Sequence, residues 1–251
     1  KFSGYLGRLR VSNTSAGGLV LSTAAGSSFT LTGGLTVDPA AVLRATAVAL
    51  GVGGDWSADG TAFMGRSTVT FSGASGNTAA ITSGGSFDFL VADMQAGTLI
   101  FSTNVTVAST MTLLSGSLDL SASSVTVRGG WNETGGTVVG GTSRVLFNGA
   151  AAQTVIQRPG STFGAFISSS SVSLTIAGPL STTREFEWHR GALNFAGRAL
   201  SIRGDMLNMS GATAATAGST TTLVAASTQN VTFAALDSVV IDNADPAGGR
   251  L

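Results

Sequence analysis

The sequence predicts an all-β protein, and within that class a parallel β-solenoid (β-helix) built from repeats of about 75 residues. Three observations lead to this prediction. Apolar and polar residues alternate in short bursts, a set of landmark residues returns in a fixed order, and Gly, Ser and Thr fill 99 of the 251 positions. Charged residues make up only 10% of the chain, so hydroxyl groups must provide most of the polar surface.

The alternation is clearest between residues 99 and 127. A new pair of apolar residues, one position apart, begins every six or seven residues there. These pairs are Leu99/Phe101, Val105/Val107, Met111/Leu113, Leu118/Leu120 and Val125/Val127. Alternation with a period of two buries one side of each strand and leaves Ser, Thr or Asn on the other.

The landmarks define a longer period. GGDWSADGT around Trp56 returns as RGGWNETGGT around Trp131, and Phe71 returns as Phe147 at nearly the same interval. A third landmark recurs at Phe87, Phe163 and Phe233. We therefore interpret residues 1–251 as one segment with two complete units, 54–128 and 129–203, and two partial units, 1–53 and 204–251.

Short strands with small turns form either antiparallel hairpins or the sides of a solenoid. Asp59-Gly60 and Asn148-Gly149 are the only hairpin dipeptides of the Asn-Gly or Asp-Gly type. The solenoid is therefore favoured. A turn with three faces uses about 18 to 20 residues, which predicts about four turns per unit and about 13 turns in all.

One stretch fits two structures. Asp38-Pro39, the following AAVLRATAVAL and Gly51 have the capping pattern of a helix. The repeat, however, aligns Leu43 and Leu50 with Leu118 and Val125, which belong to expected strands. We predict strands here, because tertiary context overrides helix propensity.

Composition excludes several classes of protein. The chain has 13 basic and 13 acidic residues and no cysteine. Balanced charge argues against an electrostatic nucleic-acid binder, and the missing cysteine excludes disulfides and thiolate chemistry. No run of 18 apolar residues occurs, so we expect no membrane insertion by this segment. Because the pattern starts and stops within a unit, we expect a piece of a longer protein.

The succession of GxW at Trp56, TVTFxG at Phe71, FxxL at Phe87, GxLxL at Leu118 and VTVxG at Val125 resembles the repeat arrays of bacterial surface and secreted proteins. It is similar to filamentous-haemagglutinin-like and autotransporter-passenger β-solenoids. The resemblance covers nearly the whole chain. It implies an extracellular or cell-surface location and a role as a stalk, adhesin or filament element. The family has no shared catalytic residues, so none is assigned here.

The densest polar cluster is REFEWHR, residues 184–190. On a strand, Glu185, Glu187 and His189 share one side, and two carboxylates about 7 Å apart fit the spacing of an inverting glycosidase. An exposed, charge-balanced surface is the simpler interpretation. A carbohydrate contact through Glu185, Glu187, Trp188 and His189 is the alternative.

The other candidates have structural interpretations. Trp56, Trp131, Phe71, Phe147, Phe87, Phe163 and Phe233 are expected to be packing landmarks, because they recur at equivalent positions. The acidic residues next to the first two tryptophans are expected to be turn residues, since calcium requires six or more oxygen ligands. We expect no metal site and no cofactor.

The sequence therefore predicts a structural and adhesive segment of a bacterial surface or secreted protein, without catalytic activity. A carbohydrate-active or carbohydrate-binding β-helix that uses Glu185, Glu187 and Trp188 is the alternative. Stacking or lateral self-association is also expected, because unpaired strand edges recruit other strands. A surface glycan or receptor is the other expected partner.

Overall fold

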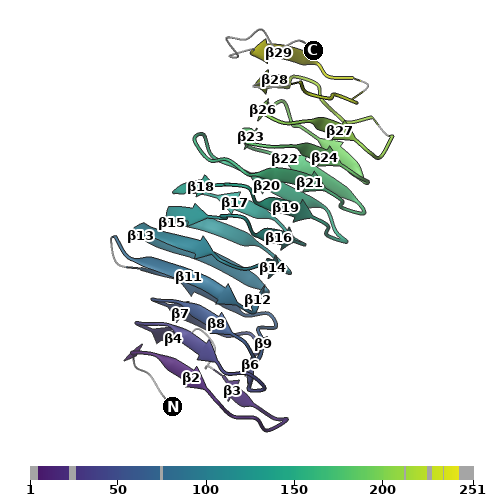
Figure 1. Cartoon of the computed structure of the whole chain (residues 1–251). Helices are drawn as coiled ribbons and strands as arrows, with labels where there is room; N and C mark the ends of the chain where they lie inside the picture. Colours follow the sequence, from purple (N-terminus) through teal and green to yellow (C-terminus); the bar gives the residue numbers. More distant parts are fainter. Residues whose placement is uncertain are drawn as a thin grey trace.

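The computed structural model describes residues 5–22, 27–73, 76–211, 213–224, 228–233 and 235–242. Strands stack along one axis, with the N-terminal end at the bottom and the C-terminal end at the top of Figure 1. Every strand pair in the described residues is parallel, and these residues contain no helix. The protein is a parallel β-solenoid, as the sequence predicts, and each turn has three faces.

The first face runs the length of the solenoid. Its strands are β1 (Tyr5–Leu6), β4 (Ser28–Leu31), β7 (Ala49–Val52), β10 (Thr68–Phe71), the first part of β13 (Phe89–Phe101), the first part of β15 (Met111–Asp119), β17 (Trp131–Glu133), β20 (Gln153–Ile156), β22 (Ser173–Ile176) and β25 (Ala192–Asn194). Strands β13 and β15 bend across a corner, so their second parts belong to the next face.

The second face follows the first in each turn. Its strands are β2 (Leu9–Val11), β5 (Leu35–Val37), β8 (Trp56–Ala58), β11 (Thr78–Ser83), the second parts of β13 and β15, β18 (Thr137–Val139), β23 (Leu180–Thr182), β26 (Ala199–Ile202), β28 (Thr220–Val224) and β29 (Ser238–Asp242). Residues 161–163 lie between β18 and β23 on this face. Thr162 N donates to Val138 O in the turn before, and Phe163 forms a β-bridge with Thr182 in the turn after.

The third face completes the turn. Its strands are β3 (Leu19–Leu21), β6 (Val42–Ala45), β9 (Thr61–Phe63), β12 (Gly85–Phe87), β14 (Val105–Val107), β16 (Ser124–Val127), β19 (Arg144–Phe147), β21 (Ala165–Ser168), β24 (Phe186–Trp188) and β27 (Met206–Asn208). Strand β9 contacts β12, which joins the three-stranded sheet to the seven-stranded sheet of this face.

The turns are somewhat longer than the sequence analysis expects. In the middle of the chain, Cα partners in successive turns step from Val105 to Val125 to Val145. Turn length varies elsewhere, from the short step between Thr221 and Val239 to the long step between Leu9 and Leu35. The chain makes about 11 turns, so the expected 13 is wrong. At 4.8 Å per turn the stack is roughly 50 Å long.

The apolar residues of the alternating pattern fill the interior. The inward residue of each strand stacks on the inward residue of the strand above it in the next turn. Leu99, Val105, Met111, Leu118 and Val125 are all at most 1% exposed. The stretch that fits both a helix and strands forms β6 and β7, as predicted. Strands form there because they allow the apolar residues to pack into the core.

Glycine is needed where the chain turns from the first face to the second. Gly116 and Gly136 occupy the same corner in successive turns and have φ values of +77° and +70°. A Cβ atom on Gly136 would lie 2.4 Å from the carbonyl oxygen of Gly116. A side chain at this corner would therefore push the turns apart.

The sequence period from Trp56 to Trp131 is not a whole number of turns. Trp56 lies on the second face, between Leu35 and Ile81, whereas Trp131 lies on the first face, between Met111 and Val155. Eleven strand positions separate the two tryptophans, and three positions make one turn. The offset is therefore three turns and two thirds, so the equivalent landmarks lie on different faces and not in one column.

The period instead repeats a packing arrangement on a different face. Trp56 and Phe87 have ring centroids 5.0 Å apart, and Trp131 and Phe163 have theirs 4.9 Å apart, both edge to face. Phe71 lies 6.3 Å from Phe87, and its counterpart Phe147 lies 6.4 Å from Phe163. Each landmark moves back by one face, so the second cluster reproduces the first after rotation by one third of a turn.

Candidate functional site

The REFEWHR segment lies at the third face, where β24 follows β16, β19 and β21 along the stack. Phe186 and Trp188 point inward and are 0% exposed, whereas Glu187 points outward. The alternation that the sequence predicts for this strand is therefore present. It places the two acidic residues and His189 on the outer surface.

Trp188 is excluded as a carbohydrate contact. Its ring is buried against Phe233, with centroids 5.9 Å apart, and its indole N–H donates to the carbonyl oxygens of Arg190 and Gly191. The interpretation of Trp188 as a contact residue is wrong, because an inward position on a solenoid strand leaves no ring face for a sugar. Trp188 is a packing residue like Trp56 and Trp131.

Arg144 joins the two carboxylates from two turns away. Its Nη1 lies 3.0 Å from Glu185 Oε1, and its Nη2 lies 3.6 Å from Glu187 Oε1. The strand between them places Ala165 beside Arg144, and this small side chain lets the guanidinium reach across. Arg144 is not among the site residues that the sequence predicts. The correct turn length would have identified it, because Glu185 follows Arg144 by two turns of the chain.

Two further side chains of the segment complete a polar network. His189 Nε2 lies 2.7 Å from Glu187 Oε2, and Arg184 Nε lies 3.4 Å from Glu185 Oε2. The side chains of Glu185 and Glu187 are only 18% and 17% exposed. The guanidinium of Arg144 therefore lies against both carboxylates, and each of them has a second partner in the same segment.

A shallow groove borders this network. Its volume is about 390 Å³, and the side chains that line it include Thr126, Arg144, Leu146, Ile167, Ser169 and His189. It runs over β16, β19 and β21. The groove therefore combines apolar side chains with hydroxyl, guanidinium and imidazole groups that can form hydrogen bonds.

Glu133 is a buried carboxylate next to Trp131. It is 3% exposed, accepts a hydrogen bond from Trp131 Nε1 at 2.8 Å, and accepts another from the backbone N–H of Arg158 at 2.9 Å. Burial raises its pKa above the ordinary 4.5, while these hydrogen bonds and the charge of Arg158 oppose the rise. Its partners are all structural groups, so Glu133 fixes a corner of the solenoid.

The other acidic residues next to the tryptophans also have structural contacts. Asp55 Oδ1 accepts the backbone N–H of Ala80 at 2.9 Å, in the next turn of the second face. Within the described part of the chain, no group of three or more His, Cys, Asp or Glu residues is placed to hold a metal ion. No helix capable of crossing a membrane is found in those residues.

Comparisons of the chain with protein-family models, with curated proteins and with solved structures found no match. The geometry itself defines the class: the chain is a three-faced parallel β-solenoid with a continuous apolar core and an outer wall rich in hydroxyl groups.

Proposed function

We propose that this chain is a structural and adhesive segment of a bacterial surface or secreted protein, and that it acts as a rigid spacer without catalysis. The observation that carries the proposal is the unbroken core. Inward side chains stack from turn to turn between the first and the last described strands, so the two ends are held apart along one axis (Figure 1). In a solenoid each turn contacts mainly its neighbours, so length can be added without changing the fold.

The composition of the wall supports the same role. Outward positions are mostly Ser, Thr and other small residues, and the net charge is zero. Like charges that face each other on successive rungs would repel, whereas hydroxyl groups bond laterally to neighbouring turns. A spacer needs this regularity over its whole length more than it needs a catalytic cleft.

Distance measurements between spin labels test the spacer. The chain has no native cysteine, so Val20→Cys paired with Thr126→Cys or with Met209→Cys gives unique label sites on the third face. Thr126 lies five turns and Met209 nine turns from Val20. We expect narrow distributions near about 24 Å and about 43 Å along the axis. Broad distributions, or distances that do not grow with the number of turns, would contradict a rigid spacer.

The groove over β16, β19 and β21 favours a second candidate, a carbohydrate-binding surface. Arg144 and His189 supply the polar groups, and the pairing of both with Glu187 holds them in place. We expect binding to polysaccharides on a glycan array to be lost in Arg144→Ala and His189→Ala. The matched control is Arg10→Ala, because Arg10 also forms an exposed ion pair, with Asp38 at 2.9 Å, but lies at the other end. Equal binding by all three variants would exclude the groove.

A further inference from the structure

The second face of the solenoid has acidic residues at its corners in the lower turns and arginines in the upper turns. When turns are counted from β2, strand β8 lies in the third turn and β26 in the tenth (Figure 1). Asp55 precedes β8 and Asp59 follows it, whereas Arg198 precedes β26 and Arg203 follows it. The third and tenth turns therefore carry opposite charges at both corners of one face.

Two further turns show the same contrast closer to the middle. Asp93 lies at the corner into the second face in the fifth turn, where β13 bends. Arg158 lies at the same corner in the eighth turn, after β20, and the strand pairings of the first face place it in the same column as Asp93. Among the described residues, no arginine or lysine lies at either corner of this face in turns three to six. The lower half of the face is therefore acidic.

The opposite charges at these corners have no charged partner within the chain. Asp55, Asp59, Arg198 and Arg203 are exposed, and the ion pairs of the described residues use other side chains. Asp93 is also outside those ion pairs. Each of these groups is therefore free to meet a charge of opposite sign on another molecule.

Two carboxylates lie among the upper arginines, and both have partners within the chain. Glu185 is paired with Arg144 at 3.0 Å and with Arg184 at 3.4 Å. Asp205 accepts the backbone N–H of Asn230 at 2.8 Å and the side-chain amide of the same residue at 3.2 Å. The charge that the upper half presents to a partner is therefore positive.

A two-fold rotation matches the two halves. An axis that runs along the strands between the sixth and seventh turns places the third turn of one copy opposite the tenth turn of the other, and the fifth opposite the eighth. Each corner then meets the same corner of the second copy. Aspartates 55, 59 and 93 face arginines 198, 203 and 158, in that order, and every pair occurs twice. A parallel arrangement would instead bring like charges together.

The wall between the corners allows the two faces to approach each other. Its outward side chains are short, as at Ser117, Thr137 and Ser201, and Val139 is 47% exposed beside the axis. Turns three to ten, with a width of about four residues, provide roughly 500 Å² on each copy. This area is at the lower end of the range for specific interfaces, so we expect weak and reversible association.

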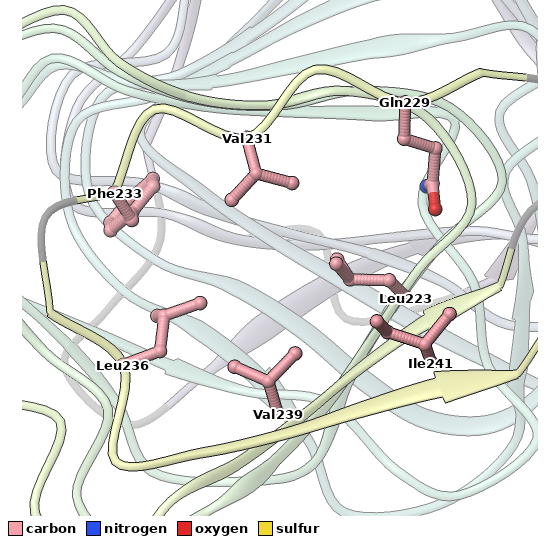
Figure 2. Close-up of a pocket in the computed structure, with 7 residues that line it drawn as sticks. All are labelled: Leu223, Gln229, Val231, Phe233, Leu236, Val239 and Ile241. Carbon is pink, nitrogen blue, oxygen red and sulfur yellow. The ribbon is translucent and has the colours of Figure 1, made fainter. Parts of the chain in front are cut away.

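The surface lies away from both ends of the described chain. Figure 2 shows the apolar interior at the C-terminal end, where Leu223, Val239 and Ile241 are among the residues that line a cavity of about 450 Å³. None of these residues belongs to turns three to ten. The charge pattern of the second face therefore does not depend on what precedes or follows the described residues.

We propose that two copies of this chain associate side by side and antiparallel, with second face against second face. The inference rests on the proposed spacer function and names its partner, a second copy of this chain. Because both copies use the same surface, the contact closes as a dimer and joins two spacers that point in opposite directions.

Sedimentation velocity of the whole chain over a range of concentrations tests the proposal. The wild-type chain should reach a dimer and nothing larger, and high salt should weaken it. Asp55→Arg with Asp59→Arg makes both halves of the face basic, and Arg198→Asp with Arg203→Asp makes both halves acidic. Each double variant should dimerise about tenfold more weakly or worse, because like charges meet.

Mixing the two double variants separates lost complementarity from lost folding. The mixture should form dimers that contain one copy of each variant, since a basic face then meets an acidic face. Arg66→Asp with Arg128→Asp is the matched control: it makes the same charge change as the acidic variant, but at exposed positions between the third and first faces. This control should dimerise like the wild-type chain.

Asp119 sharpens the test at the axis. It lies on the outer side of the second face in the sixth turn, and its Oδ1 accepts the N–H of Ser121 in its own chain. The rotation brings it near its own copy, so Asp119→Asn should strengthen dimerisation severalfold. A monomeric wild-type chain, a mixture that stays monomeric, or a control as weak as the double variants would overturn the proposal. The spin-label distances are measured within one chain, so they test the spacer separately.

Discussion

The Trp56 cluster, which consists of Trp56, Phe71 and Phe87, and the Trp131 cluster, which consists of Trp131, Phe147 and Phe163, have the same ring geometry on different faces of the solenoid. Three faces of similar width make this possible, because a group of side chains packs equally well after rotation by one third of a turn. The sequence period therefore marks where the same packing of aromatic rings recurs. The backbone itself repeats once per turn.

The two clusters differ at their edges. The indole N–H of Trp56 donates to the backbone oxygen of Gly84, whereas that of Trp131 donates to the buried carboxylate of Glu133. The Trp131 cluster also continues through Phe166 into further rings, whereas Leu90 stands at the corresponding position of the Trp56 cluster. The core of the repeat is thus retained while its corners change.

The largest expected effect comes from removing the tryptophans. Trp56→Ala and Trp131→Ala should each lower the free energy of unfolding by about 3–5 kcal/mol, through lost burial and the cavity left behind. Trp131→Ala should cost more, because it also removes a hydrogen-bond donor from the buried Glu133. Urea denaturation followed by circular dichroism measures both. A smaller loss for Trp131→Ala would mean that the polar corner contributes nothing.

Gln153 should produce the next largest difference. Its buried amide accepts from the N–H of Gly149 and donates to the carbonyl oxygens of Val127 and Gly129. Gln153→Ala removes these three hydrogen bonds and leaves Val127 O only its bond from the backbone N–H of Asn148, so it should cost about 1–3 kcal/mol. Asn77, one repeat period earlier, is the exposed counterpart near the Trp56 cluster, and Asn77→Ala should change stability by about 0.5 kcal/mol or less. Equal losses in the same denaturation assay would contradict the assigned role.

Residues 90 and 166 distinguish the two clusters and can be exchanged. Phe166→Leu gives the Trp131 cluster the residue of its counterpart and should cost about 1 kcal/mol, mostly through lost ring contacts. Leu90→Phe makes the reverse change in a filled core and should cost about 1–3 kcal/mol through overpacking. Hydrogen exchange of the neighbouring strands measures both locally. A stabilising Leu90→Phe would show that the Trp56 cluster has unused space.

The smallest expected effect is a change with pH at Glu133. Because the folded-state pKa is raised above 4.5, the contribution of this group is fully present below the unfolded-state pKa and is lost as pH rises through the folded-state pKa. The urea midpoint of the wild-type chain should therefore fall as pH rises from the unfolded-state pKa through the folded-state pKa of Glu133. This fall should be absent in Glu133→Gln. Identical pH profiles for the two chains would show that burial does not control this carboxyl group.

Prediction from sequence succeeds for features that depend on neighbouring residues. The alternation at Val125 and Val127 identifies their strand and its buried side, and low charge with frequent glycine favours stacked turns. Arg144 shows the limit. Its contacts with Glu185 and Glu187 depend on the length of each turn, and a small error in that length places it on another part of the surface.

Trp188 shows the same limit in a different way. Its neighbours in the sequence are charged, which suggests an exposed contact residue, but its inward register buries it completely.

The amino-acid sequence alone determined that the chain is all-β, that its strands are short and one-sided, and that its aromatic landmarks pack together, because period-two alternation and local side-chain volume decide these properties. The length of each turn, the face on which each landmark lies and the charged groups that meet across turns become visible only in the folded chain. The physical reason is that these depend on a register summed over many corners, and each corner can add or remove a residue without disturbing the local pattern.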